Sequence, residues 1–276
     1  MPKKPKLGQN FLISPTAPRA IVDALGNIAD ACVLEIGPGR GAITHLLANR
    51  ARRLIAVEYD PVLAATLRRS YASRPAIEIR SASILDVNLE ELARQEGKLC
   101  VVGNLPYYLT SDILLHLFRH ALAIDRAVLM VQREVADRIT ASPGSRDYGL
   151  LTATAQLYGT VEPLLTLPPE AFSPPPDVFS TVFRMFMQPR FEELGVSAEG
   201  FIPFLRLCFA QKRKTLANNL RSAGFPADAI ASAMNDCGLH PQVRAEAVPL
   251  EETACLLRGM TDRSSFHPEQ NPGAPS

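Results

Sequence analysis

The sequence predicts an α/β protein in which a mostly parallel sheet, covered by helices on both faces, is followed by a smaller all-helical domain. Three observations support this fold class. Short apolar runs rich in β-branched residues alternate with helical patterns through the first half of the chain, a glycine-rich turn follows the first run, and no strand pattern is visible beyond Gln188. Strands separated by helices indicate a parallel sheet, because each parallel connection must cross over it.

The first half of the chain alternates regularly. A short helix from Ser14 to Gly26 comes first, with Ser14 as its cap and Gly26 as its stop. The predicted strands are 32–36, 54–58, 77–79, 101–102 and 127–131. The predicted helices among them are 42–49, 61–71 and 113–120. Pro61 suits the first turn of its helix, where no backbone N–H is needed.

The pattern changes after residue 131. We expect a helix over 150–158 and strands over 161–167 and 178–187, separated by the segment 168–176, which contains five prolines. Such a loop is stiff and cannot join a strand ladder. The segment 198–258 is typical of helices broken near Gly224 and Gly238. We therefore predict a catalytic domain over 1–190, a helical domain over 191–260 and a disordered tail over 261–276.

Composition is that of an ordinary globular protein, with 47% hydrophobic and 21% charged residues among 276. No apolar run is long enough to span a membrane, and the N-terminus lacks the apolar segment of a signal peptide. The five cysteines are scattered and form no C-x-x-C pair. They predict reduced thiols in a cytoplasmic protein, and no metal site.

Positive charge is concentrated in two places although the net charge is only +1. The first is an N-terminal arm and the second is a stretch without any acidic residue. These basic residues are Lys3, Lys4 and Lys6, then Arg206, Lys212, Arg213, Lys214 and Arg221. The pattern favours a polyanion such as RNA as partner. A solvated helix face with acids nearby in space is the alternative.

The glycine-rich turn after the first strand, Glu35-Ile-Gly-Pro-Gly-Arg-Gly41, suits a ligand that needs a close backbone approach. With Ala42 it also fits the loose dinucleotide pattern G-x-G-x-x-G/A. Glu58 closes the second strand, 17 residues beyond Gly41, where an acid can accept from both hydroxyls of a ribose. Together these features predict a cofactor that contains adenosine, either NAD or S-adenosylmethionine.

The fourth strand ends in Asn104-Leu-Pro-Tyr107. A carboxamide beside an aromatic ring suits a nucleobase, because the amide reads an edge while the ring stacks on a face. The alternative is a simple turn in which Asn104 caps a helix and Tyr107 packs inward. No histidine, lysine or Ser–Tyr–Lys set near Asn104 offers the proton donor that a nicotinamide enzyme needs, which favours S-adenosylmethionine.

Several segments together resemble the ribosomal RNA adenine dimethyltransferase family, most closely its KsgA/RsmA branch. Asn104-Leu-Pro-Tyr107 is similar to the signature of adenine N6-methyltransferases. The other matching segments are 8–12, 35–41, Glu58, 132–135, 148–149, 172–176 and 209–216. They occur in order from Gly8 to Leu216. The resemblance implies a Rossmann-like, seven-stranded methyltransferase fold with S-adenosylmethionine as cofactor.

The resemblance also implies roles for individual residues. The target adenine would be held by Asn104, Leu105, Pro106, Tyr107 and Phe172, with the amine bonded to Asn104 and the Leu105 carbonyl and the ring between Tyr107 and Phe172. The cofactor would be bound by Asn10, Leu12, Gly37, Gly39, Glu58 and Asn104. The family's acid after the third strand is missing, so either Ser83 or Asp86 would hold the cofactor adenine. Tyr108 and Phe179 stand where the family usually has Asn and Asp.

The implied activity is dimethylation of N6 of two adjacent adenines in the 3′-terminal hairpin loop of 16S rRNA, with a role in ribosome biogenesis. The partner would be the small ribosomal subunit, bound by a monomer without membrane contact. One alternative is a large-subunit rRNA methyltransferase of the antibiotic-resistance type, which the proline loop and the 209–216 segment disfavour. Others are an assembly factor that acts mainly by binding and, more distantly, a nicotinamide oxidoreductase.

Overall fold

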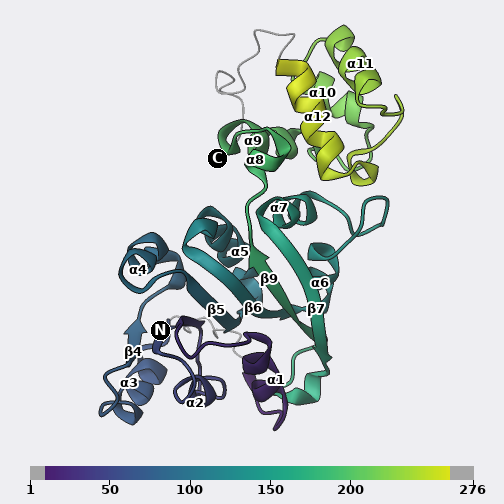
Figure 1. Ribbon diagram of the computed structural model, residues 1–276. Helices are drawn as coiled ribbons and strands as arrows, with labels where there is room; N and C mark the ends of the chain where they lie inside the picture. The colour runs from purple at the N-terminus through teal and green to yellow at the C-terminus, as the bar shows by residue number, and fades with distance from the viewer. Residues whose placement is uncertain (1–9, 262–276) are drawn as a thin grey trace, which may run out of the picture. The chain divides into compact units, whose positions relative to one another are not determined.

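A computed structural model describes residues 10–261 of the chain (Figure 1). The N-terminal lysines and the predicted tail beyond residue 261 lie outside the described residues. The described residues form two compact units: those up to Ala136 with Thr160–Gln188, and Asp137–Gly159 with those from Pro189 onward. The second unit therefore takes in 137–159 as well as the segment predicted to be helical.

The first unit is built on a seven-stranded sheet with the order β4-β3-β2-β5-β6-β9-β7. Its strands are β2 Cys32–Ile36, β3 Arg53–Glu58, β4 Ile77–Ser81, β5 Leu99–Asn104, β6 Ile124–Gln132, β7 Gly159–Leu167 and β9 Ser180–Met187. Strands β2 to β6 are parallel, and β9 runs antiparallel to β6. The predicted Rossmann-like α/β fold is confirmed.

Both faces of the sheet are covered, as its sequence predicts. Val33, Ala56 and Val102 pack into one core with the helices α1 Ala17–Ala24, α2 Thr44–Leu47 and α3 Pro61–Ser70. The alternate positions, including Leu34 and Val101, are equally buried. Strands buried on both faces are apolar at every position, so these strands were recognisable in the sequence.

The strand order reverses between β2 and β5, since β3 and β4 lie on one side of β2 while β5 and β6 lie on the other. In open α/β sheets such a switch point leaves a crevice at the carboxyl ends of the strands. Polar side chains and glycines at the ends of β2, β3 and β5 therefore converge at one edge of the sheet.

Two helices of this region had not been predicted, α4 Leu89–Glu96 and α6 Arg133–Ile139, whereas α5 Thr110–Arg119 had. Helix α4 is mostly polar, so its periodicity is weak. Its boundaries are set by Asn88, whose side chain accepts from the N–H of Glu91, and by Gly97, which has φ +85°. These capping residues are the signal that periodicity alone leaves out.

A second, two-stranded sheet joins the beginning of the described chain to the proline-rich loop. Strand β1, Phe11–Leu12, pairs antiparallel with β8, Phe172–Ser173. The N–H of Ile13 adds a hydrogen bond of 2.8 Å to the carbonyl of Ala171. Strands of two residues have no periodicity, and this pairing was not predicted.

The second unit is helical. It contains α7 Leu150–Tyr158, α8 Phe191–Leu194, α9 Ala198–Cys208, α10 Leu216–Ser222, α11 Ala227–Asp236 and α12 Leu250–Thr261. The predicted breaks at Gly224 and Gly238 fall between α10 and α11 and just after α11. Within residues 10–261 no helix has both the length and the apolar character needed to cross a membrane.

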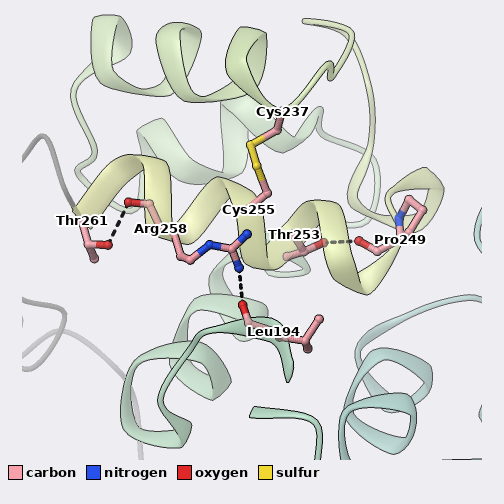
Figure 2. The surroundings of a disulfide bond; sticks show 7 residues. All are labelled: Leu194, Cys237, Pro249, Thr253, Cys255, Arg258 and Thr261. Atoms are coloured by element: carbon pink, nitrogen blue, oxygen red, sulfur yellow. Dashed lines mark hydrogen bonds between the residues drawn. A yellow bond between two sulfur atoms is a disulfide. The ribbon is translucent and has the colours of Figure 1, made fainter. Parts of the chain in front are cut away.

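Figure 2 shows a disulfide between Cys237 and Cys255 in this unit. The prediction of five reduced thiols is wrong for these two residues, although Cys32, Cys100 and Cys208 are free and buried. Cys237 follows α11 and Cys255 lies within α12, and packing of these two helices brings their Cα atoms to 6.1 Å although the cysteines are 18 residues apart. No local sequence pattern indicates such a pair.

Candidate active site

A cavity of about 780 Å³ opens at the carboxyl ends of β2, β3 and β5. It lies at the switch point of the sheet. Among the residues predicted to act in catalysis or cofactor binding, ten line it: Asn10, Leu12, Gly37, Gly39, Glu58, Ser83, Asn104, Leu105, Pro106 and Tyr107. Their convergence depends on the fold, because they come from five separate segments of the chain.

The turn after β2 and the end of β3 form one hydrogen-bonded corner of the cavity. Gly37 and Gly39 have φ of 64° and 59°, and the N–H of Gly37 donates to the carbonyl of Val57. The carboxylate of Glu58 accepts from the N–H of Gly39 and from that of Asp60, both at 2.9 Å. Glu58 is only 3% exposed, so these bonds fix a negative charge at the cavity wall.

Asn104, the last residue of β5, is also held in a defined orientation. Its Nδ2 donates to the backbone carbonyl of Asn10 at 3.1 Å. This contact leaves Oδ1 as the acceptor of the amide. A Cβ on Gly37 would lie 3.8 Å from the carbonyl oxygen of Asn104, so the ends of β2 and β5 approach closely. The described contact of Asn104 is thus with the N-terminal segment, and it does not cap a helix.

Tyr107 follows Asn104 and is half-buried against β9. Its hydroxyl lies 2.8 Å from Oγ of Ser180, which is fully buried at the start of that strand. Burial raises the pKa of Tyr107, so the ring remains a neutral phenol at physiological pH. The hydroxyl edge of the Tyr107 ring is therefore held by Ser180, while another part of the ring remains accessible from the cavity.

The structure does not bring two predicted residues to the cavity wall. Asp86 is exposed at the end of a short turn, whereas Ser83 lines the cavity and its Oγ accepts from the N–H of Leu85. Phe172 is 2% exposed and packs in the core, where it pairs with Leu12. The roles assigned to these residues stay predictions.

The cavity also has lining residues that had been assigned no role from the sequence. Tyr59 and Tyr108 are large and exposed, and Arg40 stacks on Phe11, with its guanidinium carbon 4.2 Å from the ring centroid. Exposed aromatics give no sequence signal of their own. Arg40, in contrast, lies between two glycines of the turn, and this position could have indicated that it lines the cavity.

Glu35 is a further residue that sequence reasoning did not assign. It lines the cavity, is 1% exposed, and its Oε2 has no hydrogen-bond partner among residues 10–261. Burial, together with the neighbouring charge of Glu58, raises the pKa of Glu35 to about 8. Its carboxyl is therefore mostly protonated at neutral pH. An acid inside the otherwise apolar strand Cys32–Ile36 was the available clue.

The predicted basic stretch lies in the helical unit. Its five members are exposed: Arg206, Lys212, Arg213, Lys214 and Arg221. Lys212 donates to the backbone carbonyl of Arg146 and Lys214 to Oγ of Ser222, each at 3.4 Å. None of the five forms an ion pair with a described acid, so their charges are available to an anionic partner.

The cavity fits S-adenosylmethionine in its chemistry. A fixed, buried carboxylate at the end of β3 suits the hydroxyls of a ribose, and the glycine turn permits close backbone approach. The polar groups of Asn104 and the ring of Tyr107 adjoin this region in the same cavity.

Comparison with known proteins identifies the family. Residues 1–261 match the family model described as ribosomal RNA adenine dimethylase. A protein of Acidobacterium capsulatum named ribosomal RNA small subunit methyltransferase A is 61% identical, over 95% of this chain and 92% of its own. Its namesake in Koribacter versatilis is 58% identical, over 92% and 93% of the two chains.

Solved structures agree on the fold. A dimethyladenosine transferase from Plasmodium falciparum has a TM-score of 0.78 at 22% identity, covering 91% of this chain and 98% of its own. The 23S rRNA methyltransferase ErmE has a TM-score of 0.69 at 26% identity, covering 91% and 100%. From the family model and the high identity of its relatives, we conclude that this chain belongs to the ribosomal RNA adenine dimethylase family.

Proposed function

We propose that the chain dimethylates N6 of two adjacent adenines in the 3′-terminal hairpin loop of 16S rRNA, as part of small-subunit biogenesis. Family membership makes it an S-adenosylmethionine-dependent rRNA adenine dimethyltransferase, as the sequence predicted. Relatives 58% and 61% identical are named for the small subunit, whereas the 23S enzyme is only 26% identical. The small subunit is therefore the better-supported substrate.

The observation that carries the proposal is the orientation of Asn104. Because Nδ2 is bonded to Asn10, the Oδ1 atom is left to accept from the amine of the target adenine. The amine is a weak nucleophile, since its lone pair is delocalised into the ring. Acceptors at Asn104 and at the Leu105 carbonyl would favour a pyramidal nitrogen with a directed lone pair.

Alignment supplies much of the catalysis in this mechanism. Holding two reactants in line can contribute about 7–11 kcal/mol at most. The cofactor supplies the electrophilic methyl group. After transfer, the methylated ammonium is acidic enough to lose its proton to water, so no strong base is needed. Pro106 stiffens the turn, and Tyr107 would stack on the adenine. Phe172 would support the N-terminal segment, since it pairs with Leu12.

Cofactor binding would be shared among the cavity residues. Glu58 would accept from the ribose hydroxyls, Gly37 and Gly39 would allow close approach, and Asn10 and Leu12 would close the site from the N-terminal segment. Ser83 is the better candidate for the adenine end, since it lines the cavity and Asp86 does not.

The exposed cations of the helical unit would hold the RNA backbone, as would the N-terminal arm of Lys3, Lys4 and Lys6. Phosphate contacts position the RNA without specifying a base. The target base must leave its stack, at a cost of a few kcal/mol, which favours an adenine in a loop. An rRNA substrate implies a cytoplasmic site of action, and we propose that the monomer is the active form.

Incubation with labelled cofactor and unmethylated small subunits, followed by mapping of the label, tests the proposal. We expect label on two adjacent adenines near the 3′ end of 16S rRNA. Asn104→Ala should lower turnover more than about tenfold, a loss of transition-state stabilisation, while cofactor still binds. Asn235→Ala, at an exposed asparagine of α11, is the matched control. Label confined to large-subunit rRNA would refute the substrate assignment.

A further inference from the structure

We propose that Tyr108, Phe179 and Arg133 form a stacking platform beside the cavity for the nucleobase that neighbours the target adenine. The inference rests on the proposed function, because it concerns the RNA that enters the methyl-acceptor site. The platform would act on the base next to the one that reacts.

The sheet places all three residues at the edge where the cavity opens. Strand β5 ends at Asn104 and β6 ends at Gln132, and Gln132 is paired with Ser180 at the start of β9. Tyr108 follows β5, Arg133 follows β6 and Phe179 precedes β9. Because β5, β6 and β9 are consecutive in the sheet, these residues occupy adjacent strand ends.

One hydrogen bond connects this edge to the acceptor site, and a second joins two members of the platform. The hydroxyl of Tyr107 bonds with Ser180, which ties the segment next to Tyr108 to the residue next to Phe179. The N–H of Arg133 donates to the carbonyl of Phe179 at 2.9 Å. The platform is thus built on the same backbone that positions the ring of Tyr107.

The platform offers the chemistry that a base needs. Tyr108 is 58% exposed and Phe179 is 43% exposed, so two flat apolar rings face solvent. Tyr108 itself lines the cavity. The guanidinium carbon of Arg133 lies 5.2 Å from the centroid of the Phe179 ring, which adds a positive charge. Aromatic rings combined with arginine bind single-stranded nucleic acid by stacking and charge, with little dependence on sequence.

The substrate supplies a reason for such a surface. When one adenine enters the cavity, the adjacent nucleotide remains joined to it through a single phosphate. That base has lost its stacking neighbour, and a ring at the cavity edge can replace the lost contact. Since two adjacent adenines react in turn, the platform would hold one while the other occupies the site.

The test uses the full-length protein with S-adenosylhomocysteine, so that no methyl group is transferred. RNA hairpins carry 2-aminopurine immediately 5′ or 3′ of the target adenine, and fluorescence is followed during titration. Wild type should quench the probe on one side. Tyr108→Ala and Phe179→Ala should each weaken RNA binding by about tenfold, within the range measured for loss of one stacked base, and should reduce the quenching. Tyr108→Phe should restore wild-type behaviour.

A matched control exists on β9, the strand that Phe179 precedes. Phe186 is 42% exposed, and the guanidinium carbon of Arg184 lies 4.9 Å from the centroid of its ring. It lies toward the other end of β9, where it is paired with Arg126. Phe186→Ala should leave binding and quenching unchanged. No quenching on either side, or an equal loss in Phe186→Ala, would overturn the platform. Methylation of unmodified subunits by wild type is measured separately, and its absence would count against the proposed function itself.

Discussion

The hydroxyl of Tyr107 lies 2.8 Å from Oγ of Ser180, a fully buried residue 73 positions away. This bond joins the acceptor loop after β5 to the start of the antiparallel strand β9. The orientation of the Tyr107 ring is therefore set by its contact with the sheet as well as by its own loop.

We expect Ser180→Ala and Tyr107→Phe each to lower turnover by roughly fivefold, the equivalent of one hydrogen bond of about 1 kcal/mol. The reason is loss of ring orientation, so the effect should fall on kcat more than on cofactor affinity. The double variant should be no worse than either single variant, because both remove the same bond. Single-turnover kinetics provides the measurement, and strictly additive losses would contradict a shared role.

Glu58→Ala should raise the dissociation constant of S-adenosylmethionine by at least about tenfold, since hydrogen bonds to a charged group contribute about 1.5–3 kcal/mol. The substitution also releases the N–H groups of Gly39 and Asp60 that the carboxylate now holds. Isothermal titration calorimetry measures the change. Glu192→Ala, at an exposed glutamate of α8, serves as control, and an unchanged constant for Glu58→Ala would remove Glu58 from the site.

The elements that could be predicted from the sequence are those whose residues are determined by their own local environment. The strands β2, β3, β5 and β6 were recognisable because burial on both faces makes them continuously apolar. The glycine turn and Asn104 were recognisable because their chemistry is unusual for a plain turn. Helix α4 was missed because its apolar residues are few.

Contacts between distant segments could not be predicted in the same way. The bond between Tyr107 and Ser180, the pairing of Leu12 with Phe172 and the disulfide of Cys237 each depend on tertiary packing. Phe172 illustrates the consequence: the family resemblance implied that its ring faces the target adenine, whereas Phe172 pairs with β1 and packs in the core.

Replacement of Lys212 and Lys214 together by Ala should flatten the salt dependence of RNA binding. Each lost phosphate contact lowers the slope of log K against log salt by about 0.7–0.9, so we expect a change of about 1.5. Fluorescence titrations between 50 and 200 mM salt, roughly the range over which such contacts are screened, give the slope. Arg69→Ala with Lys98→Ala removes two exposed cations of the other unit. If both double variants shift the slope equally, the RNA does not bind specifically at the helical unit.

The final prediction concerns Glu35 and pH. Its pKa is raised from 4.5 to about 8 in the folded protein, so between these values the native state holds a proton that the unfolded state releases. The free energy of unfolding should therefore fall as pH rises from about 4.5 to about 8, by an amount on the order of 4 kcal/mol, and level off above. Glu35→Gln, which stays neutral, should lose this contribution.

Urea unfolding of wild type and variant at pH 5, 6.5 and 8 measures the difference between their profiles. Glu78→Gln is the control, because arginine neighbours lower the pKa of Glu78 and its carboxylate stays ionised throughout this window. The stability advantage of Glu35→Gln over wild type should grow steadily with pH, whereas Glu78→Gln should run parallel to wild type. Parallel profiles for Glu35→Gln would mean that the carboxyl is solvated or paired when it ionises, and that the cavity floor is more polar than its apolar strand suggests.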